Sequence, residues 1–325
     1  MAVTFSAAVN IIKHQGERGI CMNCLSIERL NNCAQNAEKF VEASENTYAD
    51  ALNAAAQKIY NERAERPVVL VSGPSGSGKT TSAMRIARIL KDNGCGAHTI
   101  SMDNYFKTLT KEELELSARG EFDFESPMRL DTELFKEHLV KLSRCEEIDI
   151  PTFDFARQVS RPGMKLRIKR GDIVILEGIH ALNPIVTGDS DSYTNCVYVS
   201  VRTRIENSKG ELLHPSKIRL MRRLIRDRLY RGRELPETFE FFRSVERGEG
   251  LYIMPHKGRA NFDIDTFIPY EPMIYRNILL PLLEQASGTY EDYERYSDIE
   301  RFLREMVSVD KELVPENSLV REFIG

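Results

Sequence analysis

The chain has few cysteines and no long apolar run, and each absence excludes a class of protein. Six cysteines in 325 residues do not form the dense framework of a disulfide-stabilised domain, so reduced thiols in a cytoplasm are expected. No stretch approaches eighteen consecutive apolar residues, which excludes a membrane-spanning helix. The first twenty residues include Lys13, His14 and Arg18, unlike a secretory signal peptide. We therefore expect a cytoplasmic protein without a membrane partner.

A strong charge of one sign is also absent. The net charge is −4 and neither half of the chain is strongly basic, so a nucleic-acid partner is not expected. Local basic clusters therefore need a smaller anionic partner. Hydrophobic residues make up 42% of the chain and charged residues 29%, which is ordinary for a globular protein with a sizeable core. We expect a small-molecule substrate and a homo-oligomeric assembly.

Short apolar runs alternate with helical patterns along most of the chain. Residues 34–63 contain neither Pro nor Gly and carry an apolar stripe, which predicts a helix. Residues 67–72 then form a β-branched apolar run typical of a buried parallel strand. Further strands are predicted at 97–102, 172–177 and 196–201, and further helices at 131–142, 216–230 and 298–309.

This alternation predicts an α/β fold with a doubly wound, mostly parallel sheet and helices on both faces. Residues 1–65 are expected to form a mostly helical N-terminal extension. Residues 66–290 would form the α/β domain, and residues 291–325 a C-terminal helical tail packed on it.

Residues 73–80, Gly-Pro-Ser-Gly-Ser-Gly-Lys-Thr, match the phosphate-binding pattern G-x-x-x-x-G-K-[ST]. Glycines let the backbone turn tightly and direct N–H groups at phosphate oxygens, and the following helix adds its positive dipole end. Lys79 would reach the β and γ phosphates, and the Thr80 hydroxyl would ligate Mg²⁺. A strand precedes the motif and a helical pattern over 81–91 follows it, as the motif requires. The sequence thus predicts a P-loop NTPase-type fold with nucleotide contacts from Gly73, Ser75, Gly76, Ser77, Gly78, Lys79, Thr80 and Thr81.

Two carboxylates follow predicted strands, so they belong at the same edge of the sheet as the P-loop. Glu177 is a candidate second Mg²⁺ ligand or, in the ordinary reading, a loop-capping acid. Asp103 can take the proton of an attacking hydroxyl as a general base, although acidic loop residues are common. The P-loop alone does not separate a GTPase switch, an ATP-driven motor and a kinase.

Four arginines share one face of the predicted helix over 216–230: Arg219, Arg222, Arg223 and Arg226. A charge run at helical spacing is usually a solvated face. Four like charges without acidic partners repel, however, and are easier to explain if they meet polyphosphate. Arg231 and Arg233 flank a glycine and can act as a mobile lid.

Several short motifs follow one another in a specific order and spacing, at residues 101–106, 122–127, 150–155, 175–183, 222–227, 231–233, 244–249 and 317–325. Their order resembles the uridine kinase and phosphoribulokinase family of P-loop kinases, most closely the bacterial uridine-kinase-like nucleoside kinases. The resemblance runs from about residue 66 to the end.

The resemblance implies an ATP- and Mg²⁺-dependent transferase that carries the γ-phosphate of ATP to an alcohol, most closely the 5′-hydroxyl of a nucleoside. It implies catalytic roles for Asp103, Lys79 and Arg226. Asp123 falls where the family binds ribose hydroxyls, although an acid leading a helix before Pro127 is the ordinary reading. The arginines would contact nucleotide phosphates (Arg226, Arg231) or substrate (Arg223, Arg233).

The segment over 153–161 departs from the family pattern. Uridine kinases have a Tyr, a Phe and a His there that hold the pyrimidine. Phe153 and Phe155 can still stack on a base, but no His follows, and Gln158 offers an amide that can pair with a purine or a pyrimidine. The base preference need not be uridine. A kinase for another polyol or sugar phosphate, and a nucleotide-binding regulatory protein with little transfer activity, both remain alternatives.

Four N-terminal residues have partial zinc-site spacing: His14, Cys21, Cys24 and Cys33. The C-x2-C pair is a frequent zinc half-site, whereas the second pair is irregular. A structural zinc ion and ordinary reduced thiols are both open readings.

Overall fold

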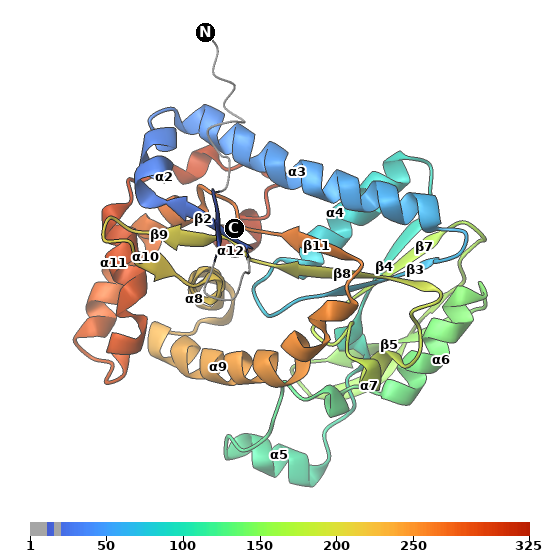
Figure 1. Cartoon of the computed structure of the whole chain (residues 1–325). Helices are drawn as coiled ribbons and strands as arrows, with labels where there is room; N and C mark the ends of the chain where they lie inside the picture. The colour runs from blue at the N-terminus through green and yellow to red at the C-terminus, as the bar shows by residue number, and fades with distance from the viewer. Residues whose placement is uncertain (1–11, 16–20) are drawn as a thin grey trace.

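A parallel β-sheet of five strands forms the centre of the molecule (Figure 1). The computed structural model describes residues 12–15 and 21–325. All neighbouring strands in this sheet are parallel, in the order β11 (Phe262–Asp265), β8 (Thr194–Ser200), β3 (Val68–Ser72), β7 (Ile173–Glu177) and β4 (Ala97–Ser101). The predicted doubly wound fold is confirmed.

Alternate side chains of the central strands enter two different hydrophobic cores. Val69 and Val71 of β3 face one core, while Val68 and Leu70 face the other. Because successive residues of a strand point to opposite faces, a strand covered on both sides must be apolar throughout. The first core contains residues of α3 (Ala37–Glu62), α4 (Lys79–Asp92), α8 (Pro215–Arg231) and α10 (Glu271–Ser287), and the second those of α6 (Thr132–Ser143) and α7 (Pro184–Thr187).

The strand order places the functional loops at one edge of the sheet. After β3 the chain builds β4 and β7 on one side, and it then crosses to build β8 and β11 on the other. In parallel sheets a ligand crevice forms where the winding reverses, beyond the carboxyl ends of the strands. The P-loop follows β3, Asp103 follows β4 and Glu177 ends β7, so all three lie at this edge.

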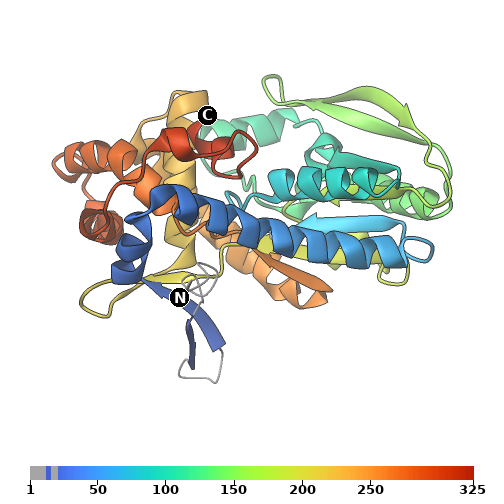
Figure 2. The same cartoon turned by 90° about the horizontal axis from the view of Figure 1, so that it is seen from above.

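The N-terminal region packs on the central domain through both strands and helices. β1 (Ile12–Gln15) and β2 (Cys21–Ser26) join β9 (Arg204–Glu206) and β10 (Leu212–Leu213) in a second sheet. Ser26 caps α2 (Ile27–Ala34) by accepting a hydrogen bond from the Arg29 N–H. α3 runs along one side of the central sheet (Figure 2), and its Tyr48 hydroxyl lies 2.7 Å from Ser82 Oγ on α4. The extension therefore shares a core with the sheet, and its boundary at residue 65 stays a prediction.

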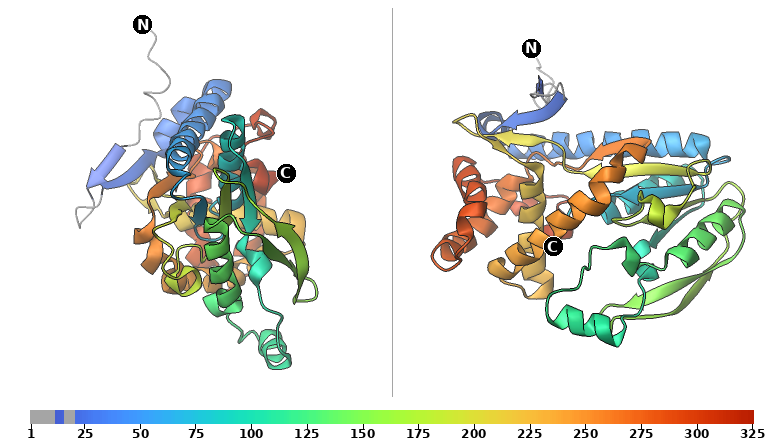
Figure 3. Two further views of the ribbon diagram at one scale, coloured as in Figure 1. Left: turned by 90° about the vertical axis from the view of Figure 1, so that its right-hand side faces the viewer. Right: turned by 60° about the horizontal axis from the view of Figure 1, so that its bottom comes forward.

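An excursion between β4 and β7 lies on the α6 side of the sheet (Figure 3). It contains the short helices η1 (Met102–Tyr105) and η2 (Pro127–Arg129), the peripheral helix α5 (Lys111–Ala118) and the antiparallel pair β5 (Ile148–Asp154) and β6 (Val159–Leu166). The segment over 153–161, read from the sequence as a loop, is the turn of this hairpin and its flanking residues.

The last third of the chain is mostly helical. It contains α9 (Leu235–Gly248), the short helices η3 (Glu249–Ile253), η4 (Met254–Arg259), η5 (Tyr293–Tyr296) and η6 (Lys311–Leu313), α11 (Ser297–Glu305) and α12 (Arg321–Ile324). α11 ends four residues before the predicted residue 309, because the backbone becomes extended at Met306. None of the helices described is long and apolar enough to cross a membrane.

Candidate active site

The P-loop between β3 and α4 forms a cradle that only glycine permits at several positions. A Cβ on Gly73 would lie 1.9 Å from the carbonyl oxygen of Val199. Gly76 and Gly78 have φ of +75° and +79°, a conformation that L side chains rarely adopt. Gly78 caps α4, so the first N–H groups of that helix face the loop. The Thr80 side chain is exposed. These features suit a polyphosphate with a Mg²⁺ ion.

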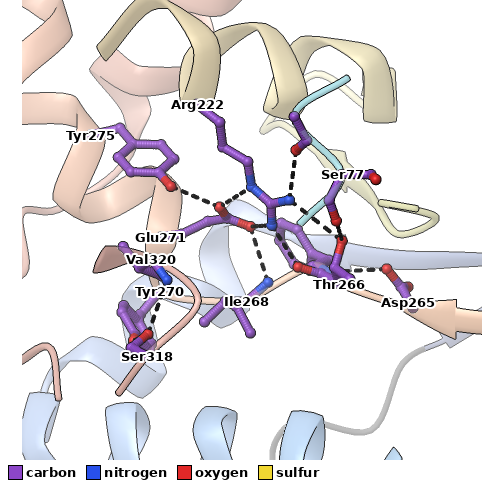
Figure 4. Close-up of polar contacts among 12 residues, drawn as sticks. Ser77, Arg222, Asp265, Thr266, Ile268, Tyr270, Glu271, Tyr275, Ser318 and Val320 are labelled. Atoms are coloured by element: carbon purple, nitrogen blue, oxygen red, sulfur yellow. Dashed lines mark hydrogen bonds and ion pairs between the residues drawn. The ribbon is translucent and has the colours of Figure 1, made fainter. Parts of the chain in front are cut away.

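A buried network of polar side chains binds backbone carbonyl oxygens of the P-loop (Figure 4). The Arg222 guanidinium is fully buried and binds both carboxylate oxygens of Glu271, at 2.7 and 2.8 Å. It also donates to the carbonyl oxygen of Gly76 at 3.0 Å, while the Thr266 hydroxyl donates to that of Ser77 at 2.7 Å. Burial alone lowers the pKa of Arg222, but the Glu271 carboxylate raises it above its ordinary value. The network therefore carries a permanent ion pair that fixes the loop carbonyls.

The expectation that the arginine stripe lacks acidic partners is wrong. Arg219 binds Glu249 at 2.5 Å, Arg222 binds Glu271, and Arg226 lies 3.8 Å from Glu322. These acids come from distant parts of the chain, which helical spacing alone could not reveal. Arg222 is thus structural, whereas Arg219 and Arg223 both donate to Ser75 of the P-loop, at 3.1 Å each.

Asp227 lies close to the four arginines that were predicted to contact phosphates or substrate. Its carboxylate is fully buried, and it lies within 4 Å of the guanidiniums of Arg223 (3.1 Å), Arg226 (3.8 Å), Arg231 (3.0 Å) and Arg233 (3.5 Å). The last two follow α8 around Gly232, whose φ is +63°. Asp227 had no predicted role, although it ends the motif at 222–227.

Two carboxylates at the sheet edge share one electrostatic environment with Lys79. Burial and, to a smaller extent, the nearby Glu177 carboxylate raise the pKa of Asp103 to about 6, although Lys79 opposes the shift. Glu177 is buried and pairs in register with Val71 of β3 and Ser101 of β4. The structure thus brings together the predicted base, the predicted metal ligand and the P-loop lysine.

Glu125 is a site residue that sequence analysis missed. Its pKa is raised to about 7, mainly by burial and to a smaller extent by the Asp123 and Asp103 carboxylates, although Arg223 and Lys79 oppose the shift. The end of α9 packs closely on it, since a Cβ on Gly248 would lie 2.4 Å from the Cβ of Glu125. The sequence shows Glu125 only as an acidic residue in a loop, and its raised pKa becomes apparent once its burial is known.

Asp123 is held by the segment that follows α9. Its carboxylate accepts a hydrogen bond from the Tyr252 hydroxyl at 2.9 Å and lies 3.7 Å from the Arg247 guanidinium. The ordinary reading of Asp123 as a helix-leading acid does not describe this geometry, because Ser126 caps η2. Tyr252 also packs edge-on against His180, whose pKa burial lowers to about 4. The motif at 244–249 was the available signal for this contact.

The β5–β6 turn presents aromatic rings beside the site. Phe153 is buried and Phe155 is 58% exposed, and their ring centroids lie 5.1 Å apart. The amide of Gln158 is engaged within the protein, since its oxygen accepts from Arg129 at 3.2 Å and its nitrogen donates to the carbonyl of Phe155 at 2.8 Å. The guanidinium of Arg129 lies within 6 Å of the rings of Phe106, Phe122, Phe124 and Phe153.

The predicted zinc residues are only partly described. The side chains of His14 and Cys21 lie outside the described residues. Cys33 packs in the hydrophobic core, and the Cys24 thiol lies 4.0 Å from Glu206. Burial raises the pKa of both thiols. Over the described ranges, no group of three or more His, Cys, Asp or Glu side chains has a metal-holding arrangement, so a zinc ion is without support there.

The fold and the cradle are those of the P-loop class of proteins. The chain belongs to the phosphoribulokinase / uridine kinase family, since the sequence model of that family matches residues 68–268. It is 30% identical over 196 residues to a uridine kinase of Halobacterium salinarum, covering 60% of this chain and 77% of the relative. It is 31% identical over 199 residues to a uridine kinase of Borrelia duttonii, covering 61% and 85%.

Solved structures that are similar to part of this chain are also known. One is a putative fructose transport system kinase from Silicibacter sp. TM1040, with a TM-score of 0.46 and 22% identity over 65% of this chain and 98% of that one. Another is a possible uridine kinase from Bacillus stearothermophilus, with a TM-score of 0.43 and 16% identity over 66% and 98%.

Proposed function

We propose that this kinase transfers the γ-phosphate of ATP to the 5′-hydroxyl of a nucleoside. The observation that carries the proposal is the position of Asp103. Its carboxylate couples electrostatically to Lys79 and Glu177 at the phosphate side, and to Glu125 beside Asp123. A group there can act on both the acceptor and the donor.

The donor side of the chain has the groups that hold a nucleotide. The Lys79 ammonium and the first N–H groups of α4 would bind the phosphates, and Arg223, Arg226 and Arg231 would neutralise charge that develops during transfer. The Thr80 hydroxyl and the Glu177 carboxylate supply the oxygen ligands that Mg²⁺ prefers. Bound there, Mg²⁺ would offset phosphate charge.

On the acceptor side, one carboxylate would accept a proton and a second carboxylate, held in place by its neighbours, would bind hydroxyl groups. Asp103, with a pKa of about 6, is ionised at neutral pH and can accept the proton of the attacking hydroxyl. Asp123, held by Tyr252 and Arg247, would accept hydrogen bonds from ribose hydroxyls. Phe153 and Phe155 would pack on the base, and Arg233 would close over the site.

An acceptor screen tests the proposal. Relative kcat/KM would be measured for uridine, cytidine, adenosine, guanosine and inosine, each with its 2′-deoxy form, against a panel of polyols and sugar phosphates. We expect turnover of ribonucleosides above the deoxy forms, since Asp123 reads hydroxyls. If only a non-nucleoside polyol is turned over, the acceptor is that polyol and not a nucleoside. If the chain binds ATP but no acceptor increases ATP consumption, a nucleotide-binding regulatory protein is favoured. Sedimentation velocity would test the proposed homo-oligomeric state.

A further inference from the structure

The C-terminal segment, residues 317–325, lies directly against the P-loop and its helix. A Cβ on Gly78 would come within 2.6 Å of a methyl carbon of Leu319. The Thr81 hydroxyl, in the first turn of α4, donates a hydrogen bond to the Glu322 carboxylate at 2.5 Å. The other oxygen of that carboxylate lies 3.8 Å from the Arg226 guanidinium. The segment thus contacts three residues predicted to contact the nucleotide.

The backbone of this segment is a fixed wall. Leu319, Val320 and Phe323 are completely buried. The Ser318 hydroxyl donates to Glu45 at 2.6 Å, and Arg321 donates to the carbonyl of Val314 at 2.6 Å. Contacts of this kind hold the segment without help from Glu322. The segment is therefore poorly suited to swing away as a unit.

The Glu322 side chain differs from the backbone that carries it. It retains 26% of its exposure, and Arg226 retains 18%. The ring of Phe323 packs near the guanidiniums of Arg222 and Arg226, at 5.1 and 6.0 Å. Phe323 thus anchors this end of the segment while the neighbouring carboxylate can rotate toward solvent.

The position of Glu322 is one that favours an anion. The first turn of a helix carries partial positive charge, and Arg226 adds a full one. Glu322 supplies the negative charge there when no phosphate is present. A phosphate that approaches Thr81 and Arg226 meets a like charge already bonded to both groups, and two anions cannot share them without repulsion.

Resting on the proposed function, we propose that Glu322 competes with the phosphates of the nucleotide for Thr81 and Arg226, and thereby sets the affinity of the donor site. Phosphate binding breaks the Thr81–Glu322 hydrogen bond and turns the carboxylate outward. Glu322 then weakens nucleotide binding rather than supporting it. If the carboxylate instead bound the nucleotide, for example by accepting a hydrogen bond from a ribose hydroxyl, it would strengthen nucleotide binding.

The test is isothermal titration calorimetry of the full chain with ATP, ADP and adenosine, with Mg²⁺ present and no acceptor added. Glu322→Gln removes the charge and keeps the shape. Glu312→Gln is the matched control, because that carboxylate is 76% exposed and its ion pair with Lys311 is long, at 4.0 Å. We expect Glu322→Gln to bind ATP and ADP about three- to tenfold more tightly, because it removes one partly buried like charge. Glu312→Gln should match wild type.

Adenosine separates phosphate competition from contacts to the nucleoside. It carries no phosphate, so wild type and Glu322→Gln should bind it equally. Unchanged or weaker ATP binding by Glu322→Gln would overturn the inference while leaving the kinase assignment intact. Failure of the wild-type chain to bind ATP would instead overturn the proposed function. If Glu322→Gln does not fold, Glu322→Asp, whose shorter carboxylate reaches Thr81 less well, should show a smaller gain of the same sign.

Discussion

The two halves of the candidate site are built in different ways. On the donor side the P-loop carbonyls bind a buried guanidinium and a buried hydroxyl, and the Arg222–Glu271 pair is shielded from water. On the acceptor side the rings lie on a peripheral hairpin, and Phe155 is 58% exposed. Two carboxylates there, those of Asp103 and Glu125, have pKa values raised by burial.

This difference separates two tasks. A phosphate cradle must aim many N–H groups at one place, which requires a backbone that cannot relax. An acceptor pocket that relies on ring stacking tolerates some movement, because stacking is less directional than hydrogen bonding and discriminates weakly. The comparison predicts that donor-side changes remove activity or stability. Changes to the acceptor-side rings should mainly alter KM.

Lys79→Ala tests the donor side most severely. Transfer should fall below detection because Lys79 neutralises phosphate charge. The fold should remain because this side chain, whose ammonium lies 3.5 Å from the carbonyl oxygen of Pro74, is outside the core. Coupled-assay kinetics and circular dichroism would measure both. Lys91→Ala, at the exposed end of the same helix, should behave as wild type. Near-normal turnover by Lys79→Ala would remove the basis of the kinase assignment.

Asp103→Asn tests the chemistry where the two halves meet. ATP affinity should be kept while kcat falls about 10²- to 10⁴-fold, the usual effect of a positioned base. Wild-type kcat should also fall about tenfold per unit below pH 6, since Asp103 is protonated there. The variant should lose this acid limb. Collapse of ATP binding with little change in kcat would make Asp103 a metal or structural residue.

Protonation of Asp103 should lower kcat but stabilise the folded state. Its pKa is raised from 3.8 to about 6, so the folded state binds the proton more tightly than the unfolded state. The stability that this contributes is full below pH 4 and is lost as the pH rises through 6. Asp103→Asn should therefore unfold at a higher temperature than wild type at pH 8, and this difference should shrink at pH 4.

Arg222→Met tests whether the buried network is structural. It leaves the Glu271 carboxylate buried without its partner, so the free energy of unfolding should fall by about 3–5 kcal/mol. Arg228→Met, on the same helix but in an exposed pair with Glu234, should cost less than about 1 kcal/mol. Urea unfolding would compare the two variants. An equal loss in both would mean that the network adds no special stability.

Phe155→Ala tests the acceptor side and should have the smallest effect. Loss of one exposed ring should raise KM for the acceptor about three- to tenfold, with kcat and ATP affinity nearly unchanged. Met164→Ala, 67% exposed on the same hairpin, is the control for hairpin stability. A large fall in kcat would show that the hairpin positions reacting groups, contrary to the comparison.

The sequence predicted the central strands and the P-loop because both have strong local signals. β3, β7 and β8 each contain a continuous run of apolar residues, and the P-loop motif has its strand and helix on either side. β6 was missed because most of its residues are exposed and it contains Pro162 and Gly163, so neither alternation nor apolarity indicated a strand. Local signals of this kind define elements one at a time.

The site was predicted less completely because much of it depends on contacts between distant residues. Arg222 and Glu271 are 49 positions apart, and Asp123 and Tyr252 are 129 apart. Spacing on α8 correctly grouped its arginines on one face but could not show which would be neutralised. The raised pKa of Glu125 likewise depends on burial by α9, which no local pattern encodes.

The cluster around Asp227 has a consequence for how quickly a nucleotide arrives. Four guanidiniums, those of Arg223, Arg226, Arg231 and Arg233, are grouped with the carboxylates of Asp227 and Glu322. Positive charge is therefore in excess within this cluster, although the whole chain carries −4. Such a local field draws polyanions through solution and accelerates their association, and dissolved salt at about 0.1 M screens it beyond about 10 Å. Capture of ATP should thus slow steeply as ionic strength rises, while capture of an uncharged nucleoside should be almost indifferent to it.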